Sequence, residues 1–155
     1  MTKITLDKKQ IYEFQQNREP YLMIDYANEI IPGKSAKGYK DLNEDEWFFK
    51  VHWKDDPNMP GMLQIEGLIQ LSALVILTLP GNKGKKMYLT SANDLMFKKK
   101  IVPGDKYIMT TKLNHYKRGI ANFSAEGSVG DQIVNKAKFN LVLPDEIKKY
   151  SKSNT

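Results

Sequence analysis

The chain has 155 residues, of which 41% are hydrophobic, and it contains no cysteine. This length allows one domain with a substantial core, and the lack of cysteine excludes a disulfide scaffold and thiolate metal sites. The formal net charge of +6 suits nucleic acid, an anionic membrane or an acidic protein as a partner, but Arg18 and Arg118 are the only arginines, which argues against sequence-specific nucleic-acid binding.

The N-terminal third predicts a short helix followed by a β-hairpin. Residues 6–16 place their apolar side chains on one face of a helix. Residues 21–31 and 34–42 are strand-like, and the turn signal Pro32-Gly33 separates them. The first residues contain no apolar segment of the kind found in secretory signals, so we expect a cytoplasmic protein.

A long apolar helix is expected from Met62 to Leu79, between the helix signals Pro60 and Pro80-Gly81. Its apolar side chains point to all sides, which is typical of a membrane span or of the centre of a fold. The length is close to the roughly 20 residues that a span needs. Four polar residues within it favour a buried helix over a membrane span, namely Gln64, Glu66, Gln70 and Ser72.

The rest of the chain predicts antiparallel strands. Four strand-like runs follow the helix, at residues 87–97, 106–117, 120–129 and 132–143. We expect a bulge at Asn93-Asp94 in the first run, and hairpin turns at Arg118-Gly119 and Gly130-Asp131 between the last three. Pro144 ends the sheet, and the polar tail from about residue 145 is expected to fray.

These elements together predict one α+β domain over residues 1–155. A helix that is apolar on all sides needs cover, and an antiparallel sheet curled around it supplies that cover. This arrangement is the hot-dog fold, with a curled antiparallel sheet wrapped around one long central helix. The sheet would leave an open edge, which pairing with a second copy of the chain would close.

Two ionisable residues near the start of the long helix are the candidate chemical groups. Near neutral pH the imidazole of His52 suits a general base, and the carboxyl of Glu66, if burial keeps it protonated, suits a general acid. Taken alone, His52 also fits a hydrogen-bonded loop histidine, and Glu66 a structural carboxylate bonded to Gln70 or to backbone. With Met59-Pro60-Gly61 between them, the pair favours an acid–base site.

The residues around this pair follow a known motif. His52, Pro57, Met59-Pro60-Gly61 and Glu66 have an order and spacing that resemble those of the FabZ-type 3-hydroxyacyl-acyl-carrier-protein dehydratase family. Glutamate rather than aspartate on the helix favours this branch over the related dehydratase-isomerases.

The resemblance extends over most of the chain. Residues 20–25 (PYLMID) are similar to the family's first strand, and Phe97-Lys98-Lys99 with Val102–Asp105 are similar to its later basic strand and turn. The chain departs from the family pattern at three positions around the histidine, which are Val51, Trp53 and Lys54. We expect these departures to affect the choice of substrate.

The resemblance implies reversible dehydration of a (3R)-3-hydroxyacyl thioester to the trans-2-enoyl thioester, in fatty-acid or related acyl-chain biosynthesis. His52 would remove the proton from C2, and Glu66 would protonate the hydroxyl that leaves C3. The backbone N–H of Gly61, with Pro60 and Met59 shaping the start of the helix, would stabilise the thioester oxygen.

The resemblance also implies the partners. The acyl group would be carried on the phosphopantetheine of acyl carrier protein or on coenzyme A, with no metal or redox cofactor. The histidine and the glutamate of one site would come from the two subunits of a homodimer, and three dimers could assemble into a trimer of dimers. The basic run Lys98, Lys99 and Lys100 would either dock the acidic carrier protein or be a solvated face.

Other functions stay open on the same sequence. A hot-dog subunit could bind an acyl thioester or its carrier without dehydrating it, and a thioesterase is compatible with the same fold. A nucleic-acid-binding module is a further alternative. The His–Glu pair matches the dehydratase pattern better than any of these.

Overall fold

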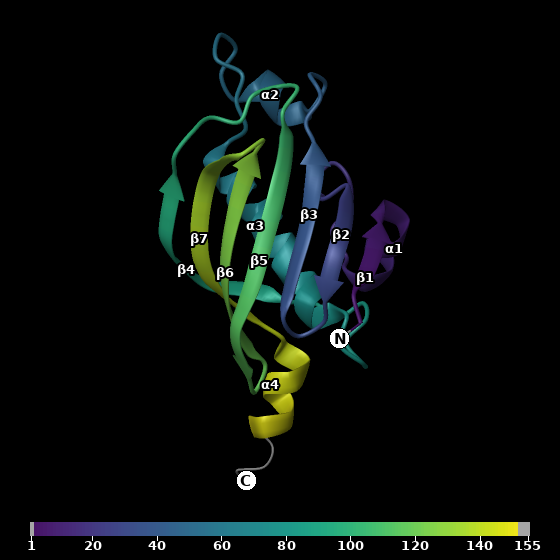
Figure 1. The fold of residues 1–155 in the computed structure, drawn as a ribbon. Helices are drawn as coiled ribbons and strands as arrows, with labels where there is room; N and C mark the ends of the chain where they lie inside the picture. Colours follow the sequence, from purple (N-terminus) through teal and green to yellow (C-terminus); the bar gives the residue numbers. More distant parts are fainter. Residues whose placement is uncertain (1, 152–155) are drawn as a thin grey trace.

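The computed structural model describes residues 2–151, which form seven strands and four helices (Figure 1). The strands are β1 (Ile4–Asp7), β2 (Tyr26–Ile31), β3 (Ser35–Asp41), β4 (Tyr88–Phe97), β5 (Lys106–Lys117), β6 (Ile120–Val129) and β7 (Gln132–Val142). The helices are α1 (Lys8–Phe14), α2 (Trp47–Val51), α3 (Gly61–Leu77) and α4 (Pro144–Ser151).

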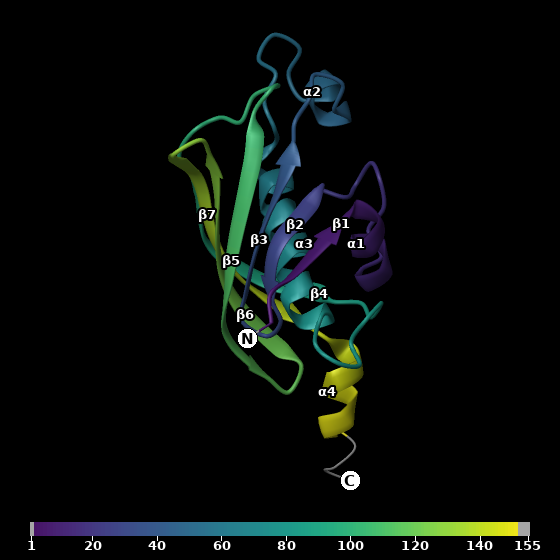
Figure 2. The ribbon, with the colours of Figure 1, turned by 45° about the vertical axis from the view of Figure 1, so that its right-hand side comes forward.

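One antiparallel sheet curls around the long helix α3 (Figures 1 and 2). The strands lie in the order β1-β2-β3-β5-β6-β7-β4, and α3 contacts five of them, β2, β3, β5, β6 and β7. The predicted α+β architecture, with a curled antiparallel sheet around a central helix, is confirmed.

The core lies between α3 and the sheet. From Leu68 to Leu77 every residue of the helix is buried except Ile69 and Ala73, which are partly exposed. Each large apolar side chain that is fully buried stabilises the fold by about 1.5–3 kcal/mol. Within residues 2–151, no helix is both long enough and apolar enough to cross a membrane.

Two small residues let α3 approach β5 closely. A Cβ atom at Gly67 would lie 2.9 Å from the sulfur of Met109. One turn further along, the hydroxyl of Ser72 lies 2.6 Å from that of Thr111 and donates to the Leu68 carbonyl oxygen at 2.8 Å. The buried hydroxyl groups therefore have partners, and the helix is fixed against the strand without an unsatisfied polar group.

The N-terminal elements differ from the prediction. Residues 4–7, which the sequence assigned partly to a helix, form β1 and pair with β2. The helix begins only at Lys8, because Asp7 and Gln10 form a capping box in which each side chain accepts from the other's backbone N–H at 2.9 Å. The predicted strand at 21–31 begins at Tyr26, and the preceding residues are held by backbone bonds to Arg18 and Tyr39 and by the side chain of Gln70.

The end of the chain is also different from the prediction. Residues 144–151 form α4 rather than a frayed tail, with acidic residues in its first turn and lysines in its last, as the helix dipole favours. The helix packs on the β5–β6 turn. Ile147 of α4 lies so close to this turn that a Cβ atom at Gly119 would be 2.8 Å from the Ile147 side chain. Tyr116 and Glu146 add a hydrogen bond between hydroxyl and carboxylate. Only residues 152–155 of the expected tail lie outside the described part.

Strand β4 forms one edge of the sheet and, within residues 2–151, pairs only with β7. The predicted bulge is present, because the pairing register shifts between Asn93 and Met96 and Asp94 has a φ of 54°. Four large apolar side chains of this strand are exposed, namely Tyr88, Leu89, Met96 and Phe97.

A row of amide side chains crosses four strands and fixes the position of β4. Asn114 on β5 donates to Asn122 on β6 at 2.8 Å, and Asn122 donates to Asn140 on β7 at 2.8 Å. Asn140 in turn donates to the hydroxyl of Ser91 on β4 at 2.9 Å. Cross-strand pairs of this kind stabilise a sheet and fix its register.

Candidate active site

His52 lies at the C-terminal end of the short helix α2. Its Nδ1 atom is 3.1 Å from the carbonyl oxygen of Asn58. A carbonyl oxygen only accepts, so a neutral His52 carries its proton on Nδ1 and leaves the lone pair of Nε2 free. The ring of Trp53 stacks on the imidazole, with ring centroids 4.3 Å apart and an interplanar angle of 22°.

A surface pocket of about 490 Å³ opens beside this histidine. His52 and Trp53 line one side, Gly61 at the start of α3 lines another, and Phe97 with Lys98–Lys100 completes it. The structure thus brings the predicted base, the helix start and the basic run around one cavity. Glu66 is not among the residues that line it.

The Met59-Pro60-Gly61 turn is rigidly held. The backbone N–H of Met59 donates to the Ile101 carbonyl at 2.8 Å, and the Met59 side chain is buried. The Pro60 carbonyl accepts from two backbone N–H groups of the first turn of α3. Gly61 lies close to Phe97, because a Cβ atom at Gly61 would lie 2.9 Å from that ring and the ring would have to shift. Its N–H, at the first helical position, has no acceptor within the helix.

A buried polar network that the sequence did not reveal supports this turn. Gln64 donates from Nε2 to the Met59 carbonyl at 2.9 Å and accepts at Oε1 from Asn135 at 2.8 Å. Asn135 also donates to the Tyr107 hydroxyl at 2.8 Å, and that hydroxyl donates to the Gln64 carbonyl at 3.0 Å. Burial raises the pKa of Tyr107, so the phenol stays protonated and acts as a donor.

Glu66 lies on α3, two residues beyond Gln64, in a different environment from His52. Its carboxylate accepts from Nε2 of Gln70 at 3.1 Å. Burial raises the pKa of Glu66, and the influence of Gln70 and Tyr21 opposes that rise only in part. The carboxyl therefore holds its proton to higher pH than an exposed glutamate would.

The side chain of Gln70 connects Glu66 to the segment that precedes β2. Gln70 is buried, and besides Glu66 its Nε2 donates to the Tyr21 carbonyl at 3.0 Å. Its Oε1 accepts from the backbone N–H of Met23 at 2.8 Å. The contact between Glu66 and Gln70, which the structural alternative for Glu66 proposed, is present, and it belongs to a larger arrangement that includes the backbone of Tyr21.

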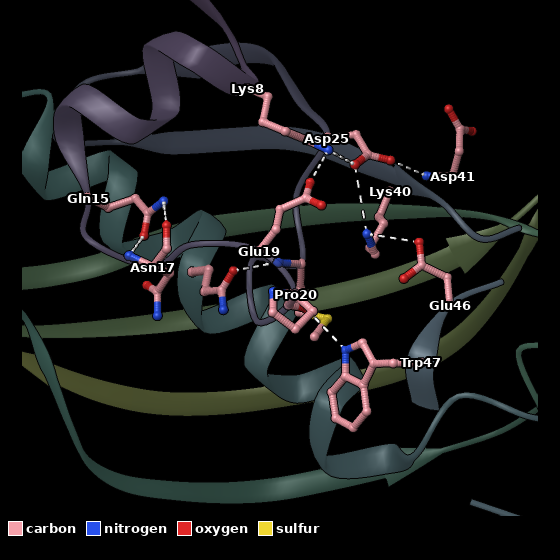
Figure 3. A network of polar contacts seen from close by, with 12 residues as sticks. Lys8, Gln15, Asn17, Glu19, Pro20, Asp25, Lys40, Asp41, Glu46 and Trp47 are labelled. Carbon is pink, nitrogen blue, oxygen red and sulfur yellow. Dashed lines mark hydrogen bonds and ion pairs between the residues drawn. The ribbon is translucent and has the colours of Figure 1, made fainter. Parts of the chain in front are cut away.

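An ion-pair network holds the same segment against the start of α2 (Figure 3). Lys40 is 5% exposed, and its ammonium lies 3.3 Å from Glu46 and 3.8 Å from Asp25. Trp47, the first residue of α2, donates from its indole N–H to the carbonyl oxygen of Pro20 at 3.1 Å. A buried lysine is stable only with such partners, so β3, α2 and the segment around Pro20 form one structural unit.

The three lysines of the basic run differ in their surroundings. Lys100 forms an ion pair with Asp56 at 2.6 Å, and Lys99 donates to Gln132 at 2.6 Å. The ammonium of Lys98 has no partner among the described residues. Residues 2–151 also contain no group of three or more His, Cys, Asp or Glu side chains placed to hold a metal ion.

Comparison with known proteins gives the family. The model of the FabA-like domain matches residues 16–138. The 3-hydroxyacyl-[acyl-carrier-protein] dehydratase FabZ of Clostridium novyi (strain NT) is 43% identical over 102 residues, which are 66% of this chain and 72% of the relative. The enzyme of the same name from Clostridium botulinum (strain Loch Maree / Type A3) is 37% identical over 139 residues, 89% of this chain and 96% of the relative.

Solved structures confirm the fold. A chain of the dehydratase heterocomplex ApeI:P from Xenorhabdus doucetiae superposes with a TM-score of 0.76 at 12% identity, covering 94% of this chain and 97% of that one. A hypothetical thioesterase from Streptococcus pneumoniae TIGR4, solved with coenzyme A, reaches 0.58 at 14% identity, with coverages of 73% and 80%. The chain belongs to the FabA-like family, and its sequence relatives place it on the FabZ dehydratase branch.

Proposed function

We propose that this protein catalyses the reversible dehydration of a (3R)-3-hydroxyacyl thioester to the trans-2-enoyl thioester, in fatty-acid or related acyl-chain biosynthesis. The observation that carries the proposal is the similarity to FabZ dehydratases over 89% of the chain, joined to a histidine and a glutamate in environments suited to a base and an acid. The acyl-binding and thioesterase alternatives are not favoured, because the sequence relatives named above are FabZ dehydratases.

His52 acts as the general base. Its Nδ1–H is held by the Asn58 carbonyl, so Nε2 presents a lone pair that can take the proton from C2 of the substrate. The ring then becomes an imidazolium, and the face of Trp53 stacked on it favours that positive charge.

Glu66 acts as the general acid. Burial raises the pKa of its carboxyl, so it can supply a proton to the C3 hydroxyl, which leaves as water. Negative charge meanwhile gathers on the thioester oxygen, where the N–H of Gly61 and the dipole of α3 stabilise it. In the reverse direction the Glu66 carboxylate takes a proton from the attacking water, and His52 returns one to C2.

A complete site requires two copies of the chain. The pocket beside His52 contains the base and the Gly61 N–H but not Glu66. The open edge of β4 carries four exposed apolar side chains, which a second copy would cover. We therefore propose a homodimer in which His52 of one subunit faces Glu66 of the other. A trimer of dimers stays a prediction from the resemblance.

Acyl carrier protein is the proposed carrier of the substrate, with coenzyme A as the second possibility. The lysines that line the His52 pocket give its rim the positive charge that an acidic carrier and its phosphopantetheine would meet. No metal or redox group has a part in the proposed steps. We place the activity in the cytoplasm, in keeping with a cysteine-free chain.

An assay of dehydration and hydration on purified protein tests the proposal. Thioesters of several chain lengths, on carrier protein and on coenzyme A, are followed by the absorbance of the enoyl group. We expect His52→Ala and Glu66→Gln each to lower kcat on the order of a thousandfold. His115→Ala and Glu126→Gln, which change a second histidine and a glutamate elsewhere on the sheet, serve as matched controls. A wild-type enzyme whose rate survives both site substitutions would refute the assignment.

A further inference from the structure

Trp53 lies against the flat face of the His52 imidazole, although it is itself a surface residue. The two ring centroids are 4.3 Å apart, and the ring planes differ by 22°. Trp53 is 54% exposed, so burial of its indole contributes less to the stability of the fold than burial of a core aromatic ring. Core packing therefore does not account for so large an apolar side chain at this position, whereas the contact with the imidazole does.

The loop of residues 53–58 brings two different groups to the same imidazole. Its first residue, Trp53, covers a face of the ring, and the carbonyl oxygen of its last residue, Asn58, lies 3.1 Å from Nδ1 at the edge of the ring. A ring held by one hydrogen bond can still turn about the axis of that bond, and the stacked indole opposes this rotation. The two contacts together fix the plane of the imidazole and leave Nε2 to the pocket that both rings line.

The loop is closed by contacts that do not involve His52. The backbone N–H of Asp56 donates to the Trp53 carbonyl at 3.3 Å, and Nδ2 of Asn58 donates to the Asp56 carbonyl at 2.7 Å. From outside the loop, the ammonium of Lys100 pairs with the Asp56 carboxylate at 2.6 Å. An exposed ion pair contributes little by itself, but the three contacts together define the shape of the loop. The fold thus presents the indole to the imidazole, and the two rings do not meet by chance.

We propose that Trp53 is a positioning residue for the base step, whose indole holds the His52 ring in the orientation in which Nε2 meets the proton on C2. The inference rests on the proposed function. In the dehydration direction the C2–H bond breaks and its proton joins Nε2, while its electron pair becomes the C2–C3 double bond as the hydroxyl leaves C3 with the proton of Glu66. Trp53 forms and breaks no bond. Its electron-rich face lies against the imidazolium that results, so the same contact that orients the ring also stabilises its charge.

Trp53→Leu removes the aromatic face and keeps an apolar side chain at the surface. We expect kcat to fall about tenfold, because a base that can turn away from C2 loses its reactive geometry, with KM for the thioester within about threefold of the wild-type value. Trp53→Phe retains a ring that can stack and should keep about half or more of the wild-type kcat. Tyr150→Leu, which removes an exposed ring from α4, is the matched control and leaves kcat and KM unchanged. All three variants should melt within about 3 °C of the wild type, because surface substitutions change stability little.

A second measurement does not depend on turnover. An imidazolium in contact with an indole quenches the indole fluorescence, so the emission of Trp53 reports the protonation of His52. The wild type should therefore show a step in tryptophan emission as pH falls through the range in which a histidine takes up its proton. The step should be absent in Trp53→Phe, where Trp47 is the remaining tryptophan. It should also be absent in His52→Ala and present in Tyr150→Leu.

The two measurements separate the inference from the proposed function. If the wild type is active and Trp53→Leu keeps its kcat, or loses only affinity for the thioester, the positioning role is refuted and the function stands. If the wild-type emission shows no step that depends on His52, the two rings are not in contact in solution, which also refutes the role. If the wild type turns over no thioester while the step is present, the function fails and the catalytic part of the inference fails with it, whereas the contact between the rings stands.

Discussion

The proposed base and the proposed acid are held by different kinds of structure. His52 caps the C-terminal end of a helix of five residues, and its ring is held by one backbone carbonyl and one exposed tryptophan ring. Glu66 lies within the 17-residue core helix and is fixed by the buried amide of Gln70. The base depends on a surface loop, whereas the acid depends on the packing of the fold.

This difference indicates where the chain can change. The departures from the family pattern, at Val51, Trp53 and Lys54, all lie on the base side, in residues that are exposed or in a loop. A loop there can alter the pocket without disturbing the core. On the acid side, the side chain of Gln70 binds both Glu66 and backbone groups of the PYLMID segment. Substitutions in the loop around His52 can thus change the pocket without disturbing the core, whereas substitutions around Glu66 would disturb the packing of the fold.

The largest expected effect comes from separating base and acid onto different chains. His52→Ala and Glu66→Gln proteins should each be inactive, and mixing them after reversible dissociation should restore about a quarter of the wild-type rate, because half of the dimers are mixed and each mixed dimer has one intact site. The rate of enoyl formation before and after mixing measures this. Mixed dimers of proven composition that stay inactive would show that base and acid come from the same chain.

The buried support of the base-side turn should be sensitive to added volume. A Cβ atom at Gly127 would lie 2.3 Å from the Tyr107 ring and 2.6 Å from the Asn135 side-chain oxygen. Gly127→Ala should therefore lower the free energy of unfolding by about 2–3 kcal/mol. Denaturant unfolding measures the change, and Ser128→Ala on the same strand should stay within about 0.5 kcal/mol of the wild type. An unchanged free energy of unfolding in Gly127→Ala would mean that Tyr107 and Asn135 can move to make room for the added methyl group.

Acyl carrier protein should dock beside the His52 pocket, at the basic run Lys98–Lys100. Lys98→Glu reverses the one charge of the basic run that has no partner among the described residues, so KM for a carrier-bound substrate should rise about fivefold, and less at high salt. KM for the coenzyme A thioester should change little. Lys117→Glu, exposed at the end of β5, is the control with the same change of charge. An equal effect of both substitutions would point to general attraction between the proteins rather than docking at this pocket.

The smallest effect concerns the stability cost of the acid. Burial raises the pKa of folded Glu66 above that of the unfolded chain, so protonation favours the folded state, and that contribution is lost as pH rises through the folded pKa. Glu66→Gln, which carries no charge, should melt about 2 °C higher than the wild type near pH 8 and at the same temperature near pH 4. Melting curves of both proteins between pH 4 and pH 8 measure this difference in melting temperature. A variant less stable than the wild type at pH 8 would show that hydrogen bonds to the carboxylate outweigh its burial.

Sequence patterns located the elements whose signals are local. Pro60 and Pro80 delimit α3, and the turns at Arg118-Gly119 and Gly130-Asp131 have the positive φ angles that hairpins of this kind use. The motif of His52 and Glu66 identified the family because its spacing lies within one stretch of chain. In each case the information is carried by residues close together in sequence.

Contacts between distant residues were not predictable in this way. Asn135 bonds to Gln64 across 71 positions, and the backbone of Tyr21 bonds to Gln70 across 49. A lone asparagine on a strand or a tyrosine in a loop has no periodicity that would single it out. Strand β1 was missed because it exists only through pairing with β2, and α4 because it forms against the β5–β6 turn.

The place of β4 in the sheet has a consequence for the order of synthesis. This strand follows α3 in the chain, yet β7 is the strand it pairs with in the described part of the chain. Thr90 on β4 bonds to Asn140, which is made 50 residues later. In a growing chain that does not yet include β7, β4 therefore has no strand to pair with. The β4 edge on which a second copy would dock therefore forms only after β7, the last strand, has left the ribosome. Incomplete chains on neighbouring ribosomes do not yet have the surface by which finished chains would pair.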